Sequence, residues 1–296
     1  MNDKELFTVV GIRENVSAPR RAARKWYSGK PVASAAILAA IIIGCFFCEL
    51  FVAKDPAYLD LSHCSAAPNG EFFFGTDTLG RDIFSMIWHG GRVSLFIGFA
   101  ATAISTVIAV VYGSISGLSS QWTDTLMMRF TEIILSVPTL LIIIFIQAIL
   151  GKANVFSLAF VIGITSWASI AKVVRTEVLQ LRWSEYVVAS RCMGGGFFHI
   201  LRRHLAPNFI SSIMFMVVMN IRGAIIAEST LSFMGLGLPL EIVSWGSMLS
   251  LSERALLTKS WWIILIPGIF LVLMLMCVTN IGNYLRKSAN RSQSNI

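Results

Sequence analysis

Charged residues are scarce in this chain of 296 residues: they make up 14% of it, whereas hydrophobic residues make up 55%. A soluble domain of this length needs far more charge to cover its surface, so most of the chain must face lipid. This excludes a soluble globular protein. A hydrocarbon core about 30 Å thick takes roughly 20 apolar residues per helix, and several segments reach that length.

The five cysteines do not form a disulfide framework, because only Cys64 falls in a loop expected on the exterior side. His63 beside it supplies too few ligands for a metal site. The sequence also has no H-E-x-x-H motif, and the five-residue spacing of His199 and His204 does not place both imidazoles on one face of an α-helix. We therefore expect no metal site.

Motifs for catalysis and nucleotide binding are missing as well. The stretch Gly113–Gly117 reads GSISG, with Ile115 at its centre, so it is no nucleophile elbow. There is no P-loop glycine–lysine motif. We expect no catalytic residue, no enzyme activity and no cofactor bound by this chain.

Apolar runs predict an all-α integral membrane protein with six spans and three polar segments. The polar segments are a basic leader at 1–31, a cytoplasmic loop at 175–207 and a tail at 286–296. The six spans together form a domain at 32–285 and cover about 32–52, 94–118, 126–150, 155–174, 208–228 and 261–284. Pro138 is expected to kink the third of them, because proline lacks the amide donor.

The basic residues predict the orientation of these spans. Sixteen lysines and arginines fall in the leader, the tail and the loop between spans four and five, with Lys172 just before the loop included, against six on the opposite side. Positive residues collect on the cytoplasmic side, so both termini are expected there, in the cytoplasmic membrane of a prokaryote. Because this charge borders apolar segments, the net charge of +8 indicates topology and lipid contact, with no nucleic-acid partner.

The loop between spans four and five carries apolar residues among charges. Residues 185–208 read EYVVASRCMGGGFFHILRRHLAPN, and the glycines at 194–196 interrupt a helix. The pattern predicts two short amphipathic helices hinged on these glycines. Exposed apolar surface of this kind is typical of a docking site for a soluble partner.

These residues resemble the "EAA" loop of ATP-binding-cassette importer permeases, E-A-A-x-x-x-G followed by I-x-L-P. Val188 stands in place of the glutamate and Ser190 in place of the second alanine, whereas Gly194 and Pro207 keep their spacing. Residues 74–98 and 228–249 resemble two further segments of the peptide and nickel branch, in the same order. The resemblance covers about residues 32–285.

The family resemblance implies the type I importer fold and a set of partners. These are a second, homologous permease subunit, two ATPase subunits that bind ATP and magnesium, and an extracytoplasmic substrate-binding protein. It implies that the loop couples ATPase motion to spans four and five. The residues expected at the ATPase are Glu185, Val188, Ala189, Ser190, Gly194, Arg202, Arg203 and Pro207.

Ionisable residues within spans are candidates for the translocation path, because burying charge in lipid is expensive. Glu132, Arg222 and Glu228 qualify. The spacing of Glu132 from Arg129 also fits a simple ion pair. In the segments outside the membrane, residues 76–82 predict a capping and salt-bridge network, and Trp245 predicts a turn with a tryptophan at the membrane interface.

The sequence leaves two classes of transported substrate open. Dipeptides or oligopeptides are expected for this branch, with nickel or a metal chelate as the alternative. A secondary transporter accounts for six spans but not for the amphipathic loop. Transport without ATPase partners would favour that carrier.

Overall fold

The computed structural model describes residues 31–52, 54–239, 241–251, 255 and 259–293. The predicted leader, apart from Pro31, and the last three residues of the tail lie outside these ranges. Within the described residues the chain is helical, and its one β-bridge joins Thr76 and Asp82. This confirms the all-α prediction for that part of the chain.

The α-helices follow one another with short connections. They are α1 (Val32–Phe46), α2 (Ile83–Leu118), α3 (Gln121–Ser136), α4 (Thr139–Leu150), α5 (Val155–Thr165), α6 (Ala168–Leu181), α7 (Glu185–Cys192), α8 (Phe197–Ile200), α9 (Ala206–Phe233), α10 (Trp245–Ser250) and α12 (Trp262–Gln293). Short 3-10 helices occupy Cys48–Leu50 and Leu61–His63, and a π-helical turn occupies Leu201–Leu205.

Three helices are long and apolar enough to cross a membrane: Ile83–Leu118, Phe197–Phe233 and Trp262–Lys287. The count rises to five if each bent pair, α3 with α4 and α5 with α6, forms one span. Helix α1 is apolar but has only 15 residues, fewer than the roughly 20 that a straight span needs. The expected count of six therefore stays a prediction.

Two spans differ from their predicted bounds at the end expected outside the cytoplasm. Helix α1 ends at Phe46, before the predicted end at Val52. Helix α2 begins at Ile83 rather than Ser94, because Asp82 caps it by accepting a hydrogen bond from the amide of Ser85 at 3.0 Å. The second span therefore extends well beyond its most apolar part.

The predicted third span bends at Pro138, as expected, but it consists of two helices rather than one kinked helix. Helices α3 and α4 meet at 88°. Val137 is extended, with ψ of 133°, as steric contact with the following proline ring favours. Pro138 then precedes the first turn of α4. A similar but smaller bend of 45° separates α5 from α6 at Ser166 and Trp167.

The predicted loop at 175–207 is shorter in the structure. Helix α6 continues to Leu181, and only α7 is a separate amphipathic helix. The expected second helix is the beginning of a continuous helix that spans residues 197–233 and includes Pro207. The last span likewise continues beyond its predicted end at Tyr284, to Gln293. Coupling loop hereafter means residues 182–205.

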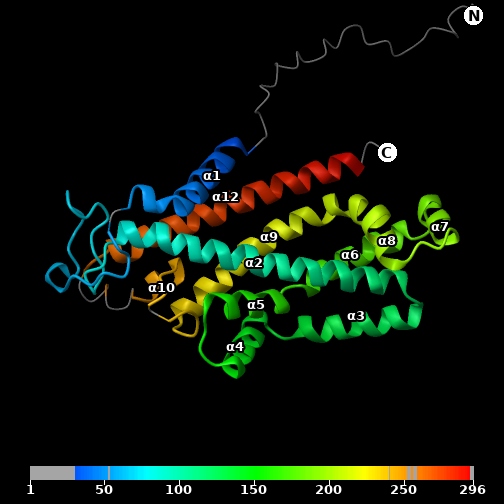
Figure 1. Cartoon of the computed structure of the whole chain (residues 1–296), viewed down its shortest axis with the longest axis horizontal. Helices are drawn as coiled ribbons and strands as arrows, with labels where there is room; N and C mark the ends of the chain where they lie inside the picture. The colour runs from blue at the N-terminus through cyan, green and yellow to red at the C-terminus, as the bar shows by residue number, and fades with distance from the viewer. Residues whose placement is uncertain (1–30, 53, 240, 252–254, 256–258, 294–296) are drawn as a thin grey trace, which may run out of the picture.

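Helix α2 lies in the centre and packs against α5, α6 and α9. Glycines permit the close approach to α6: a Cβ atom at Gly113 would lie 2.6 Å from the carbonyl oxygen of Ala171, and one at Gly117 would lie 2.7 Å from Val178. Small residues at such crossings are typical of membrane helices. In Figure 1, α7 lies at one end of the molecule, and the loop before α2 lies with α10 at the other.

Candidate functional site

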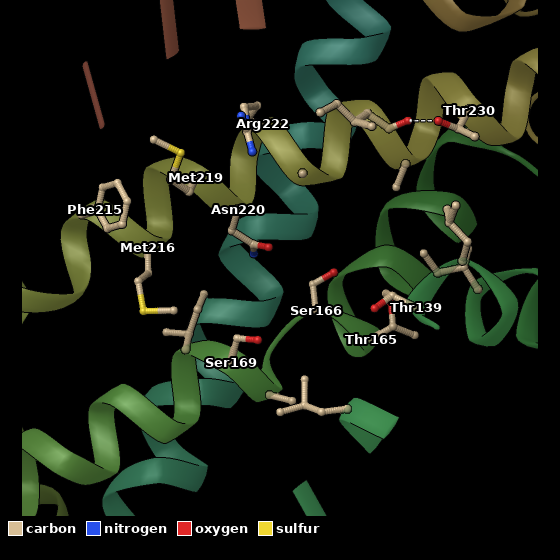
Figure 2. A pocket seen from close by; sticks show the side chains of 18 residues that line it. Thr139, Thr165, Ser166, Ser169, Phe215, Met216, Met219, Asn220, Arg222 and Thr230 are labelled. Atoms are coloured by element: carbon tan, nitrogen blue, oxygen red, sulfur yellow. Dashed lines mark hydrogen bonds between the residues drawn. The ribbon is translucent and has the colours of Figure 1, made fainter. Parts of the chain in front are cut away.

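A cavity of about 610 Å³ lies where the two broken spans face α9. Figure 2 shows side chains of α9 on one side and residues next to the breaks on the other. Its lining comprises Leu135, Thr139, Leu140, Ile143, Thr165, Ser166, Ala168, Ser169, Ile170, Phe215, Met216, Met219, Asn220, Arg222, Gly223, Ile226, Ala227 and Thr230. Irregular backbone at membrane depth is tolerated where it lines such a cavity or is buried in protein.

The lining combines one cation with uncharged polar and apolar groups. Arg222 is its single charged residue, and hydroxyl groups come from both breaks, including those of Thr139 and Ser166. Phe215, Met216 and other apolar residues form the rest. A wall with a few polar groups in an apolar surface is typical of a ligand site.

Of the three residues predicted for the path, Arg222 alone lines this cavity. Glu132 lies on α3, where its carboxylate is 2.9 Å from Arg129 Nη1 and 4.0 Å from Lys172 Nζ. That pairing confirms the alternative reading of its spacing. Sequence patterns missed the hydroxyls around Pro138 and Ser166, although Pro138 followed by Thr139, and Thr165 with Ser166, interrupt their apolar runs and were the signals for them.

Glu228 is fully buried and lies outside the cavity lining. Its carboxylate accepts hydrogen bonds from four serines: Ser94 of α2 at 3.0 Å, Ser229 at 3.3 Å and Ser232 at 3.0 Å of α9, and Ser244 before α10 at 2.7 Å. No cation pairs with it among the residues that the structure describes. This network, termed the Glu228 cluster, joins α2, α9 and the segment that begins α10.

Trp245 extends the Glu228 cluster. Its amide donates to Ser94 Oγ at 3.2 Å, and its indole Nε1 donates to the carbonyl of Ile87 at 3.0 Å. The side chain is fully buried, so the indole contacts other helices of this chain and not lipid; its position at the membrane interface stays a prediction. Glycines on the facing helix explain this burial: a Cβ atom at Gly91 would lie 2.7 Å from the indole ring.

The loop before α2 contains the network predicted for residues 76–82. Asp77 pairs with Arg81 at 2.7 Å, and its other oxygen accepts from the amides of Leu79 and Arg81. Nearby, hydrogen bonds from Ser62 and His63 lower the pKa of Asp60 to about 2, so this carboxyl stays ionised at neutral pH. These bonds give the loop a defined conformation.

The coupling loop exposes most of the residues expected to meet the ATPase. Glu185, Val188, Ala189, Gly194, Arg202 and Arg203 are exposed, as is Pro207 just beyond the loop. Ser190 is buried instead, and its carbonyl accepts from the amide of Gly195 at 2.9 Å. Large apolar side chains are also exposed here, with Met193 at 82% and Phe198 at 74%. The loop thus presents both basic and apolar surface.

A π-helical turn changes the geometry of two histidines. Our expectation that His199 and His204 lie on different faces was wrong, because their ring centroids are 5.8 Å apart. The turn at Leu201–Leu205 bonds residues five apart, which places side chains of that spacing near one another. Tyr186 of α7 lies against His204 at 5.9 Å. The three rings connect α7 to the beginning of the fifth span.

An ion pair that sequence patterns did not indicate joins α3 to α6. Asp124 at the beginning of α3 accepts from Arg175 Nε at 2.6 Å and from the second guanidinium nitrogen, Nη2, of the same arginine. Ser116 of α2 donates to the same carboxylate at 2.5 Å. The three helices therefore meet at one bidentate pair, the stronger geometry for an arginine.

Replacing Asp124 with asparagine is expected to lower stability by about 1 kcal/mol, because the guanidinium of Arg175 loses its charged partner. The pair is partly exposed, at 29% and 12%, which limits the effect. A denaturant titration in mixed micelles measures the change. Arg129→Gln removes a more exposed pair on α3 and should change stability less; an equal loss in both variants would contradict this assignment.

Metal ligands do not gather in the described part of the chain: no group of three or more histidine, cysteine, aspartate or glutamate side chains there could hold an ion. The cavity, the helix breaks and the exposed loop together define the class of a multi-span membrane transport component. Comparisons with known sequences identify the family within this class.

The family described as "Binding-protein-dependent transport system inner membrane component" matches residues 109–291. The oligopeptide transport system permease protein OppC of Bacillus subtilis is 37% identical, covering 84% of this chain and 81% of the relative. OppC of Haemophilus influenzae is 38% identical, covering 90% of this chain and 86% of the relative. The dipeptide transport system permease protein DppC of B. subtilis is 35% identical, covering 76% of this chain and 70% of the relative. The chain belongs to this family of permease subunits of ATP-binding-cassette importers.

Proposed function

We propose that this chain forms half of the translocation path of an ATP-driven importer of dipeptides or oligopeptides. Its partners are a second homologous permease, two ATPase subunits that bind ATP and magnesium, and an extracytoplasmic substrate-binding protein. Relatives named for oligopeptide and dipeptide transport support this cargo. Both termini and the coupling loop lie in the cytoplasm of a prokaryote, in agreement with the distribution of basic residues.

One observation carries the mechanical part of this proposal. A continuous helix runs from Phe197 in the coupling loop to Phe233, and its middle forms a wall of the cavity. A rigid helix transmits a displacement at one end to the other, as in rigid-body switching. Motion of the ATPases against α7 therefore shifts Phe215–Thr230 relative to the breaks at Pro138 and Ser166.

Transport by the reconstituted complex tests the cargo. The complete importer in proteoliposomes should accumulate a labelled dipeptide or tripeptide only with ATP on the ATPase side. Uptake of a nickel chelate in preference to peptides would contradict the proposal and favour the metal alternative. Uptake that persists without the ATPase subunits would identify a secondary carrier instead.

Cysteine crosslinking tests the coupling surface directly. With Ala189→Cys, a bifunctional thiol reagent should join the permease to a cysteine placed in the ATPase cleft. The exposed native Cys192 is first replaced by serine, because it would react as well. A functional complex that yields no crosslink would remove this part of the proposal.

Gly194→Ala should lower transport severalfold, because Gly194 has a φ of +83°, a conformation that a Cβ atom disfavours by about 1 kcal/mol. No atom lies within 4 Å of the added methyl group, so the effect comes from the backbone alone. Peptide-stimulated ATP hydrolysis by the reconstituted complex measures it.

Gly196→Ala is the matched control, because this glycine is two residues away, has equal free space and has a φ of −73°. It should behave as wild type. Equal losses in both variants would show that added bulk at the ATPase, rather than the turn at Gly194, causes the defect.

A further inference from the structure

We propose that Arg222 binds the carboxylate at the C-terminal end of the peptide as it passes through the cavity. This inference rests on the proposed function, and adds to it an orientation of the cargo. Arg222 is the single charged residue in a lining of 18, so the wall attracts anionic groups and repels ammonium groups. The carboxylate is the negative group that every unmodified peptide carries.

The guanidinium of Arg222 has hydrogen-bond donors that no acceptor of the described residues satisfies. Its nearest partner is Thr279 Oγ1, 3.5 Å from Nη1, and its Nε is buried without a hydrogen-bond partner among the described residues. No carboxylate of the described chain pairs with it. An unpaired cation within a span is costly unless a ligand or partner compensates it. The planar group can give two parallel hydrogen bonds to a carboxylate.

Space exists on two sides of this arginine. It lines the 610 Å³ cavity and also a second hollow of about 290 Å³ between α9 and α12, beside Thr279 and Asn280. The side chain is half-buried, so water and ligands reach it. A purely structural arginine would have its donors satisfied by acceptors of the chain, as Arg92 does: it donates to Glu49 and to the carbonyl of Phe46, both at 2.9 Å.

The neighbouring wall suits the rest of a peptide. Met219, Met216 and Phe215 precede Arg222 on α9 and line the same cavity, as Figure 2 shows. The helix from Phe215 to Arg222 rises about 10 Å, the length of about three extended residues. Methionine adapts to side chains of different shape. A fixed carboxylate beside an adaptable wall holds peptides of different sequence in one orientation.

Transport of a matched peptide pair tests the assignment. The complete importer in proteoliposomes takes up an uncharged-side-chain tripeptide, with a free C-terminus or as its amide. Wild type should prefer the free acid, and Arg222→Gln should lower that preference about tenfold by slowing uptake of the acid. Discrimination by the binding protein is common to all variants and cancels. Lys152→Gln removes an exposed charge outside the cavity and should keep the wild-type ratio.

Each outcome of this experiment either supports or overturns the role of Arg222. An unchanged ratio in Arg222→Gln with intact uptake overturns the inference. Reduced assembly of the complex, with an unchanged ratio in the complexes that do form, also overturns it and would assign Arg222 to a partner's carboxylate. Wild type that takes up no peptide at all refutes the proposed function instead. If the glutamine variant does not accumulate, Arg222→Cys is assembled first, with the exposed Cys64 and Cys192 replaced by serine, and then labelled with ammonium or sulfonate thiosulfonates. The cationic label should restore the preference and the anionic one should not; the same ratio with both labels overturns the assignment.

Discussion

Replacing Glu228 with leucine is expected to destabilise the subunit by about 3 kcal/mol and to abolish transport. The carboxylate is fully buried and accepts hydrogen bonds from four serine hydroxyls at 2.7–3.3 Å. An apolar side chain leaves these hydroxyls without their acceptor in a water-free position. Because Ser94 and Ser244 belong to different elements, the contact of α10 with α2 weakens as well.

Two variants separate this network from a general effect of charge removal. Glu228→Gln keeps the shape and offers one acceptor and two donors to hydroxyls that can do either, so about 1 kcal/mol is expected. Glu241→Leu changes an exposed glutamate near α10 and should stay within about 0.5 kcal/mol of wild type. Denaturant titration in mixed micelles measures all three. Equal stability of the leucine and glutamine variants would refute a role for the hydroxyl bonds.

Gly113→Leu is expected to lower stability by about 3 kcal/mol, or to prevent accumulation in the membrane. The new Cβ atom would lie 2.6 Å from the carbonyl oxygen of Ala171 and 2.8 Å from Val174 Cβ. Both neighbours are backbone or β-branched atoms that cannot rotate away. Helix α6 would have to move from α2, and with it the 45° bend that forms part of the cavity.

The control for Gly113 lies in another span. Gly268 of α12 has no atom within 4 Å of the position that an added Cβ atom would take. Gly268→Leu should therefore leave stability unchanged or raise it slightly, since glycine is a poor helix former. The amount of folded protein after detergent extraction distinguishes the two variants. Similar accumulation of both would contradict a tight α2–α6 contact.

Transport and stability depend on different residues in this chain. The Glu228 cluster and the α2–α6 contact hold the helices together, whereas we propose that Arg222, Gly194 and the exposed face of α7 contact partners or cargo. Variants of the first kind should reduce folded protein and transport together. Variants of the second kind should change transport by folded complexes, so the amount of folded protein and the transport rate have to be measured separately.

The local turns outside the membrane were predictable from short-range chemistry. Asp77, Arg81 and Asp82 lie within a few residues of one another, so their pairing and the cap of α2 follow from spacing alone. The Arg129–Glu132 pair is of the same kind. The glycine hinge at 194 was visible too, because a run of glycines interrupts a helix.

Contacts between distant segments were not predictable in this way. Asp124 and Arg175 stand 51 positions apart, and Ser94 and Glu228 stand 134 apart, so no periodicity links them. Trp245 was expected at the interface because tryptophans favour that zone, yet glycines on α2 leave room for its burial. The adjacency of His199 and His204 depended on a π-helical turn, which spacing rules for α-helices do not include.

By itself the sequence determined that this protein is a helical membrane component with a basic, partly apolar loop, because apolar length and charge placement are properties of single segments. Scarce charge, the first feature of the chain, also made each charge within a span informative. Only the tertiary structure decided which of them does what: Glu132 pairs locally, Glu228 binds helices together, and Arg222 faces the cavity. The physical reason is that burial and partners depend on which helix faces meet, and packing alone sets that.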